Sequence, residues 1–193
     1  MRCLIVSAHP DANSHTARLA EFVKTELARF GHSVELADLY AEGFQPVMTQ
    51  EERTTYYRAD TARLSIDDEA ARLTSAEALV LVFPTWWFGP PAILKGWFDR
   101  VWAPGIAFDL LKDGASPRLV RLRQVLMIST LNCDRTVDEK LGMPIASSLR
   151  EVLLGMSAPQ ASFDALSLYD CAKLDAARLS SFKDDIAARL SEW

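Results

Sequence analysis

Short apolar runs alternate with longer amphipathic stretches from one end of the chain to the other. A short apolar run bounded by polar turns is typical of a buried strand, whereas apolar residues three and four positions apart indicate a helix with one buried face. The apolar runs predict strands at 2–7, 33–38, 78–83, 124–129 and 158–166. The helical spacing predicts helices at 15–30, 66–74, 91–102, 145–154 and 172–190. Residues 40–65 and 103–118 are expected to be irregular.

This alternation predicts an α/β fold of three layers, in which a parallel sheet of five strands carries helices on both faces. The glycine fingerprint of dinucleotide-binding folds is missing from the sequence. Its absence favours the flavodoxin-like winding, with strand order 2-1-3-4-5, over the six-stranded alternative. A chain of 193 residues that is 49% apolar can bury one good core. We therefore expect residues 1–193 to form a single domain.

Composition narrows the classes of partner. The net charge is −5, with acidic residues spread along the chain, which argues against nucleic acid or an anionic membrane surface as the main partner. The cysteines Cys3, Cys133 and Cys171 are far apart, and all three histidines lie before residue 33, so no metal site is expected. No apolar run approaches about 18 residues, and no signal peptide is evident. We expect a cytoplasmic protein without membrane insertion.

The first stretch with chemical potential is Ser7-Ala8-His9-Pro10-Asp11-Ala12-Asn13-Ser14-His15-Thr16, between the first strand and the first helix. A helix N-terminus there offers free N–H groups and a favourable dipole to a phosphate, and Asn13, Ser14 and Thr16 can add donors. The alternative is that Asn13 or Ser14 simply caps the helix. His9 is equally compatible with a ligand contact and with capping of a loop carbonyl.

The second stretch places Trp86, Trp87 and Phe88 in the loop after the third strand. Exposed aromatic rings at a strand end are costly unless something covers them, and ligands bind at this edge of open α/β sheets. A flat conjugated cofactor fits best, with one indole facing the ligand, one facing protein, and the backbone amides of 85–88 at its edge. The alternative is that both indoles pack against the core or a second subunit. Three further aromatic residues follow at helical spacing and are expected in the core or an interface: Trp97, Phe98 and Trp102.

The third stretch is Ser129-Thr130-Leu131-Asn132-Cys133, after the fourth strand. Its hydroxyl and amide side chains are expected at the same sheet edge as the two other loops. Three such loops, at the carboxyl ends of the first, third and fourth strands, describe a flavin site of the flavodoxin type.

The chain resembles the NAD(P)H:quinone oxidoreductase (DT-diaphorase) family of flavodoxin-like flavoproteins over roughly its first 110 residues. The resemblance is carried by Ala8-His9-Pro10 with Ser14, by Asp38-Leu39-Tyr40 followed by Phe44-Gln45-Pro46, and by Phe83-Pro84-Thr85-Trp86-Trp87-Phe88-Gly89-Pro90-Pro91 with its continuation to Val101. It implies non-covalent FAD or FMN, with NAD(P)H as co-substrate. The motif string favours FAD, and the short chain favours FMN.

The resemblance also implies which residues bind the flavin. The phosphate and ribityl region would contact His9, Asn13, Ser14, His15, Thr16 and Ala17. The isoalloxazine would contact Pro84, Thr85, Trp86, Trp87, Phe88, Ser129 and Thr130. The family continues with Thr-Thr-Gly-Gly after the fourth strand, whereas this chain reads Ser129-Thr130-Leu131-Asn132. Glycine lets the backbone approach a ligand closely. The loss of the two glycines therefore affects how this loop would contact the flavin.

The implied activity is two-electron transfer by a ping-pong mechanism, from NAD(P)H through flavin N5 to a quinone-like acceptor, in a homodimer. No histidine follows residue 32, so the residues expected beside the flavin (Trp86, Thr130 and Asn132) are neighbours of the reaction and not acids or bases. Two alternatives stay open. One is a regulatory flavin-binding subunit, for example of an ion-efflux system, and the other is a flavodoxin-like electron carrier.

Overall fold

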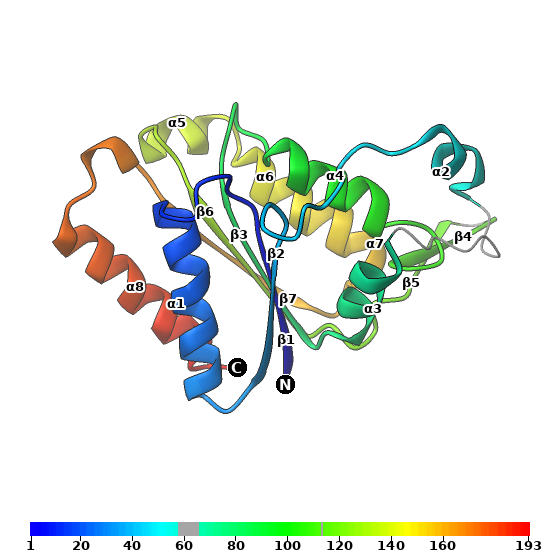
Figure 1. Ribbon diagram of the computed structural model, residues 1–193, viewed down its shortest axis with the longest axis horizontal. Helices are drawn as coiled ribbons and strands as arrows, with labels where there is room; N and C mark the ends of the chain where they lie inside the picture. The colour runs from blue at the N-terminus through cyan, green and yellow to red at the C-terminus, as the bar shows by residue number, and fades with distance from the viewer. Residues whose placement is uncertain (58–65, 113) are drawn as a thin grey trace.

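The computed structural model describes residues 1–57, 66–112 and 114–193. Its centre is a parallel sheet in the order β2-β1-β3-β6-β7, covered by helices on both faces (Figure 1). The strands are β1 (Arg2–Ser7), β2 (Ser33–Asp38), β3 (Ala78–Pro84), β6 (Gln124–Thr130) and β7 (Ser162–Leu168). Counted within this sheet alone, the order is 2-1-3-4-5, so the predicted winding is confirmed.

The position of each strand follows from its side chains. Every residue of β3 is buried, and β1 and β6 are buried along almost their whole length, as expected for central strands with helices on both sides. β2 and β7 are the edge strands and are more exposed than the central ones, and β2 alternates between more and less exposed residues. The carboxyl ends of β1, β3 and β6 lie next to one another, which places the loops after these strands at one edge of the sheet.

One face is covered by α1 (His15–Arg29) and α8 (Ala176–Leu190). Their apolar stripes bury Leu19, Val23 and Ile186 against the sheet. Both helices begin at a side-chain cap, since Ser14 accepts from the amide of Ala17 and Asp175 from the amide of Arg178.

The other face is covered by α3 (Asp67–Ser75), α4 (Ala92–Val101) and a longer helical stretch. That stretch consists of α6 (Pro144–Ser147), the π-helical η2 (Ser148–Leu154) and α7 (Gly155–Ser157). The aromatic side chains of Trp97, Phe98 and Trp102 are buried beneath α4 and pack edge to face, with ring centroids 5.7 to 6.2 Å apart. Their expected place in the core is confirmed.

Several elements differ from the sequence-based expectation. The segment 103–118 contains the hairpin of β4 (Phe108–Leu111) and β5 (Gly114–Pro117), which was expected to be irregular. Two short helices were also missed, α2 (Gln50–Thr55) and α5 (Arg135–Lys140). Both are too short to show an apolar stripe of their own. Residues 58–65 of the stretch expected to be irregular lie outside the described residues.

The last strand and the last helix begin later than expected. β7 starts at Ser162 and not at residue 158, because the amide of Ala161 bonds to the carbonyl of Ala158 and closes a turn. α8 starts at Ala176 and not at residue 172, because Cys171–Lys173 form a separate 3-10 turn (η3). The predicted helix at 145–154 is part of the longer helical stretch, whose middle is π-helical.

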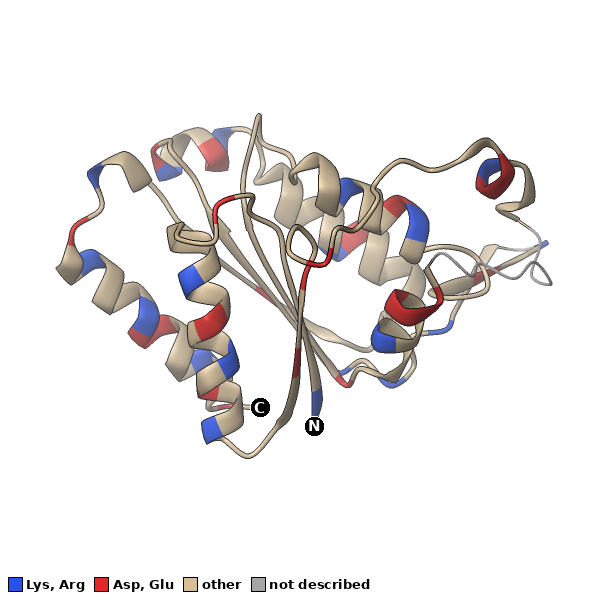
Figure 2. Cartoon of the chain, in the orientation of Figure 1, with Lys and Arg blue, Asp and Glu red and all other residues tan. Residues whose placement is uncertain are grey.

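Charged residues lie mainly on the helices and turns, and the central strands carry few of them (Figure 2). None of the helices in the described ranges is both long and apolar enough to cross a bilayer. Among the described residues, no three His, Cys, Asp or Glu side chains gather where they could hold a metal ion.

Candidate functional site

The three loops expected to share an edge do meet. The rings of His9, after β1, and Trp86, after β3, pack edge to face with centroids 6.4 Å apart. The hydroxyls of Thr16 and Thr130 lie 3.0 Å apart and are buried, which ties the start of α1 to the end of β6. The amide of Thr85 donates to the carbonyl of Thr130 at 2.9 Å. The structure therefore brings together side chains from all three predicted stretches.

The helix end beside this meeting point has two unused donors. Ser14 caps α1 by accepting from the amide of Ala17 at 3.1 Å, so the capping given as the alternative to phosphate binding is present at Ser14. Within the described ranges, no group accepts a hydrogen bond from the amides of His15 or Thr16. These N–H groups stand in the first turn, where the helix dipole is positive. The turn can accept an anionic oxygen while its cap stays in place.

Asp11 fixes the conformation of this loop. Its carboxylate accepts from the amide of Asn13 at 2.8 Å, and its own amide donates to Nδ1 of His9 at 3.0 Å. Nδ1 of His9 also lies 3.1 Å from the carbonyl oxygen of Asp11, so the loop engages this nitrogen in either tautomer. Nε2 is the ring nitrogen left for a ligand. The side chain of Asn13 is exposed next to the helix end.

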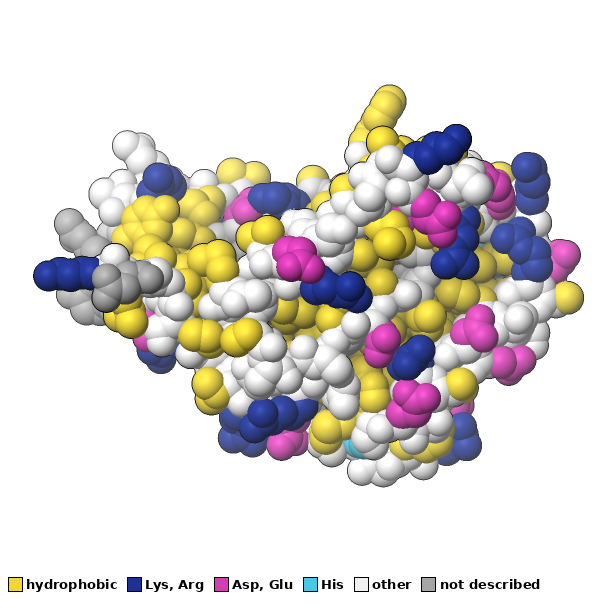
Figure 3. All heavy atoms as spheres, turned by 180° about the vertical axis from the view of Figure 1, so that it is seen from behind, with side chains coloured by type: hydrophobic (Ala, Val, Ile, Leu, Met, Phe, Trp, Pro, Cys, Tyr) yellow, Lys and Arg dark blue, Asp and Glu magenta, His cyan; other side chains and the backbone are white. Residues whose placement is uncertain are grey.

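The aromatic loop is a tight two-residue turn. Trp86 and Gly89 exchange both backbone hydrogen bonds at 3.0 Å, while Trp87 and Phe88 have φ values of 52° and 55°. This is the geometry of a type I′ turn, whose central positions favour Asn and Gly. The turn holds the indole of Trp87 fully exposed, and an apolar projection stands out from the surface at that end of the molecule (Figure 3).

The two indoles therefore have different environments. Trp86 is 44% exposed and contacts His9, whereas Trp87 contacts no protein core at all. In the part of the chain that the structure describes, the amides of Trp87 and Phe88 donate to no acceptor, whereas those of Thr85 and Trp86 are used within the protein. Pro84 is buried at the end of β3. The turn thus presents a ring face and two free N–H groups.

The loop after β6 is fastened to the segment after β7. Leu131 donates its amide to Leu168 at 2.8 Å and accepts from Cys171 at 3.0 Å. The side chain of Asn132 accepts from the amide of Ala172 at 2.9 Å, so it is directed away from the meeting point of the loops. Ser129 is buried and pairs with the hydroxyl of Ser167. Of the residues predicted here, Thr130 is the one tied to the other loops.

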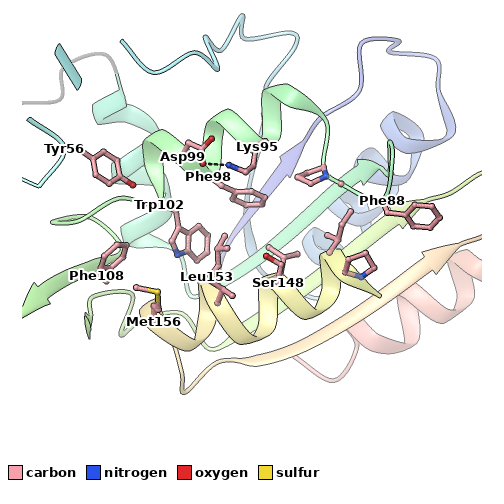
Figure 4. A pocket seen from close by; sticks show the side chains of 16 residues that line it. Tyr56, Phe88, Lys95, Phe98, Asp99, Trp102, Phe108, Ser148, Leu153 and Met156 are labelled. Carbon is pink, nitrogen blue, oxygen red and sulfur yellow. Dashed lines mark hydrogen bonds and ion pairs between the residues drawn. The ribbon is translucent and has the colours of Figure 1, made fainter. Parts of the chain in front are cut away.

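A cavity of about 400 Å³ opens beside the aromatic turn, between α4 and the helical stretch from α6 to α7 (Figure 4). Phe88 lies at one end of it, and Tyr56 and Phe108 lie at the other. Apolar side chains dominate the lining, with the ion pair of Lys95 and Asp99 at the rim. The remaining lining residues are Gly89, Pro90, Phe98, Trp102, Pro144, Ile145, Ser148, Leu149, Val152, Leu153 and Met156. A pocket of this kind suits a flat, largely apolar ligand.

Most of this lining could not be anticipated from the sequence. Tyr56 and Phe108 come from the two segments expected to be irregular. A signal for Phe108 did exist, because a short apolar run followed by Asp-Gly is a hairpin pattern. Tyr56 was visible only as half of a tyrosine pair, and nothing in the pattern connected it to the aromatic loop.

Comparison with known proteins places these features in context. A match to the family model described as "Flavodoxin-like fold" covers residues 1–176. Human ribosyldihydronicotinamide dehydrogenase (quinone) is 34% identical over 125 residues, which cover 56% of this chain and 54% of the human protein. An uncharacterised NAD(P)H oxidoreductase of Escherichia coli is 35% identical over 129 residues, covering 66% of this chain and 64% of that protein.

Among solved structures, the NAD(P)H:quinone oxidoreductase of Methanothermobacter marburgensis matches with a TM-score of 0.85 at 25% identity, covering 100% of this chain and 96% of that one. The chain spans about half the length of the first curated relatives that it matches.

Proposed function

The chain belongs to the flavodoxin-like fold family. On this basis, we propose that it is a flavin-dependent NAD(P)H oxidoreductase that reduces quinone-like acceptors. The observation that carries the proposal is the meeting of three loops, after β1, β3 and β6, at one sheet edge beside an apolar cavity. The names of two similar proteins, a ribosyldihydronicotinamide dehydrogenase (quinone) and an NAD(P)H:quinone oxidoreductase, support the same class of reaction.

In this proposal, the start of α1 binds the flavin phosphate. The free amides of His15 and Thr16 supply the donors, and the dipole of α1 favours the negative charge. Asn13 and His9 stand beside them and can donate through the side-chain amide and Nε2. No Lys or Arg occurs between residues 8 and 17, so phosphate binding would rest on neutral donors and the helix end.

The ring system would lie against the aromatic turn, with Trp87 and Phe88 supplying a face and their two free amides supplying donors at its edge. The chemistry that a bound flavin would supply here is two-electron transfer from NAD(P)H to the acceptor. Thr130 lies at the meeting point of the loops and can orient the ring through its hydroxyl. Asn132 would act indirectly, by holding the loop in place through Ala172.

The acceptor and the nicotinamide would use the same cavity in turn, which gives a ping-pong sequence. The apolar walls of the cavity would exclude water from the reacting ring. Phe88 belongs both to the cavity lining and to the aromatic turn. No acid or base side chain is required by this arrangement. The protein supplies position and a low-dielectric environment.

We propose that a second copy of the chain covers this face. Val152 and Met156 line the cavity and are exposed, as are Leu110 and Leu111 on the neighbouring hairpin. Exposed apolar side chains that adjoin a cavity are typical of an interface. Cys3, Cys133 and Cys171 are free, which fits the reducing cytoplasm that we propose as its compartment.

A regulatory flavin-binding subunit with little turnover is the second candidate. It is favoured by one observation, namely that the loop after β6 carries Leu131 and Asn132 where the family has glycines and is fastened to the segment after β7.

Titration of the purified protein with FMN and with FAD tests the cofactor. We expect saturable binding of at least one flavin, with quenching of flavin and tryptophan fluorescence. Thr130→Val should weaken binding by about tenfold, because the hydroxyl that ties the loops is lost. Thr25→Val on the surface of α1, whose hydroxyl bonds only within its own helix, is the matched control and should bind normally. The absence of binding of either flavin would contradict the proposal.

A further inference from the structure

We propose that Arg100 is a positioning residue for the proposed reaction. Through Glu52 it attaches α2 to α4, and this attachment places Tyr56 as the far wall of the cavity. The position of Tyr56 in turn limits the size of the acceptor. The inference rests on the proposed function, which supplies the acceptor. Arg100 belongs to the family motif that continues to Val101, but it is not among the residues expected to contact the flavin.

The position of α2 needs an explanation, because none of its own residues is buried. A six-residue helix is far below the length at which an isolated helix is stable in water. Without an apolar face, α2 cannot be held by hydrophobic packing of its own turns. Polar contacts must therefore fix the position of α2 relative to α4.

Arg100 provides those contacts from the buried side of α4. Its side chain is only 5% exposed, and its Nε and Nη2 donate to one carboxylate oxygen of Glu52 at 3.1 and 2.5 Å. Its Nη1 donates to the backbone carbonyl of Gln45, and the guanidinium lies 5.4 Å from the ring centroid of Phe44. A buried cation is stable only with such partners, so removing either side of the pair leaves an uncompensated charge.

Glu52 couples this ion pair to the start of α2. Its second carboxylate oxygen accepts from the amide of Thr49 at 2.7 Å, while the hydroxyl of Thr49 accepts from the amide of Glu52 at 3.1 Å. This reciprocal capping box begins the helix. One carboxylate therefore both starts α2 and attaches it to α4.

The segment before α2 also lies directly on α4. A Cβ at Gly96 would lie 2.5 Å from Cα of Pro46 and closer still to its carbonyl oxygen, so only glycine permits this approach. The chain from Phe44 to α2 is thus fixed at two neighbouring points of α4.

Tyr56 follows immediately after α2 and lines the cavity at the end opposite Phe88, facing Phe108 across it (Figure 4). Because Arg100 attaches α2 to α4 through Glu52, and Tyr56 is the next residue after α2, we expect the position of Tyr56 to respond to the loss of this pair. Loosening this attachment opens the far end of the cavity and leaves the Phe88 end, beside the proposed flavin, unchanged. A one-ring acceptor that stays near Phe88 is then unaffected, whereas a two-ring acceptor loses its far contact.

The experiment compares the wild type with Arg100→Met, Arg100→Lys, Glu52→Gln and Tyr56→Ala, using 1,4-benzoquinone and 1,4-naphthoquinone as acceptors. We expect Arg100→Met and Tyr56→Ala to raise KM for 1,4-naphthoquinone by about five- to tenfold. In Arg100→Met, which leaves the lining of the cavity intact, kcat and the KM for 1,4-benzoquinone should change less than about twofold. Glu52→Gln retains a capping side chain but loses the charge, so it should raise the same KM. Arg100→Lys should rescue part of the effect because it keeps the charge without the fork of donors.

Amide hydrogen exchange of residues 45–57 gives a readout that needs neither flavin nor acceptor. Exchange should be faster in Arg100→Met and Glu52→Gln, and unchanged in Arg29→Met, which removes the surface ion pair with Glu26 at the far end of α1. Unchanged exchange in Arg100→Met overturns the inference even if the wild type proves unable to reduce acceptors. Faster exchange with an unchanged KM for 1,4-naphthoquinone in an active enzyme also overturns it. Should Arg100→Met fail to fold, Glu52→Gln and Arg100→Lys decide by the same two measurements.

Discussion

At the scale of single residues, Trp87 and Phe88 hold a backbone conformation that neither favours. The left-handed region costs a residue with a side chain roughly 1–2 kcal/mol relative to the right-handed one. The turn between Trp86 and Gly89 carries this cost twice and exposes an indole as well. Strain of this kind clusters at ligand sites, where the surrounding structure enforces it. The strained turn is what the proposed role of these two residues in ligand binding leads us to expect.

Replacing Trp87 by Asn together with Phe88 by Gly tests this explanation. Asn-Gly is the preferred pair for a type I′ turn, so the double variant should be more stable by about 1–2 kcal/mol while binding flavin at least tenfold more weakly. Urea unfolding and flavin titration measure the two effects. Val120→Asn, at an exposed apolar position without a positive φ, should gain no stability. A double variant less stable than the wild type would show that the turn is not strained.

His32 makes stability depend on pH. Burial, and then the nearby N-terminal ammonium, lower the pKa of His32 below its ordinary value. Among the residues that the structure describes, none forms a hydrogen bond with its buried Nε2. The unfolded chain therefore binds the proton more readily than the folded one. The stabilising contribution is present above the ordinary pKa of about 6.5 and is lost as the pH falls below it.

We therefore expect the wild type to lose stability between about pH 7.5 and 5.5, and His32→Gln to lose less over the same range. Urea unfolding at these two pH values measures the difference, with His15→Gln as the control. Equal losses in the wild type and His32→Gln would exclude His32 as the source.

At the scale of elements, the sequence predicts the bounds of a strand best where the burial of its side chains determines the pattern. β1, β2 and β3 match their expected bounds within one residue, because continuous or alternating apolar runs identify strands directly. The rule that ligands bind at the carboxyl ends of strands correctly brought His9, Thr16 and Trp86 together. What the pattern could not supply was the cavity, since its walls come from helices far apart in sequence and from Tyr56 at the end of an exposed helix.

Alanine substitutions at two glycines test how closely the segment before α2 approaches α4. Gly96→Ala should destabilise the protein by about 2 kcal/mol or more, because the added methyl group collides with the backbone of Pro46. Gly155→Ala is the matched helical control, since its nearest neighbour would be the carbonyl oxygen of Arg150 at 3.7 Å. Alanine there should be neutral or stabilising by about 0.5–1 kcal/mol. Thermal or urea unfolding of the two variants checks the contrast, and equal effects would contradict it.

At the scale of the whole molecule, exposed apolar residues adjoin the cavity. Charged residues occur on α1 and α8 and on other helices (Figure 2), whereas Val152 and Met156 in the cavity lining, and Leu110 and Leu111 on the β4–β5 hairpin, are exposed. The proposed cofactor site lies where the cavity meets the sheet edge. A second copy that covers the cavity would therefore also shield the proposed flavin from water.

Val152→Glu should convert the proposed dimer to a monomer, because it places a charge among the apolar residues that line the cavity. Val120→Glu, an equally apolar exposed position outside the cavity lining, should leave the oligomeric state unchanged. Sedimentation velocity of both variants and the wild type measures the change. A wild type that sediments as a monomer at micromolar concentration would contradict this part of the proposal.

The most direct test of the central claim is anaerobic stopped-flow spectroscopy of the flavin-loaded protein, mixed first with NADH or NADPH and then with 1,4-benzoquinone. The account predicts that one of the nucleotides bleaches the flavin band near about 450 nm, and that the quinone restores it in a second step without nucleotide present. A bound flavin that stays oxidised with both nucleotides would contradict the proposed activity and favour the regulatory subunit.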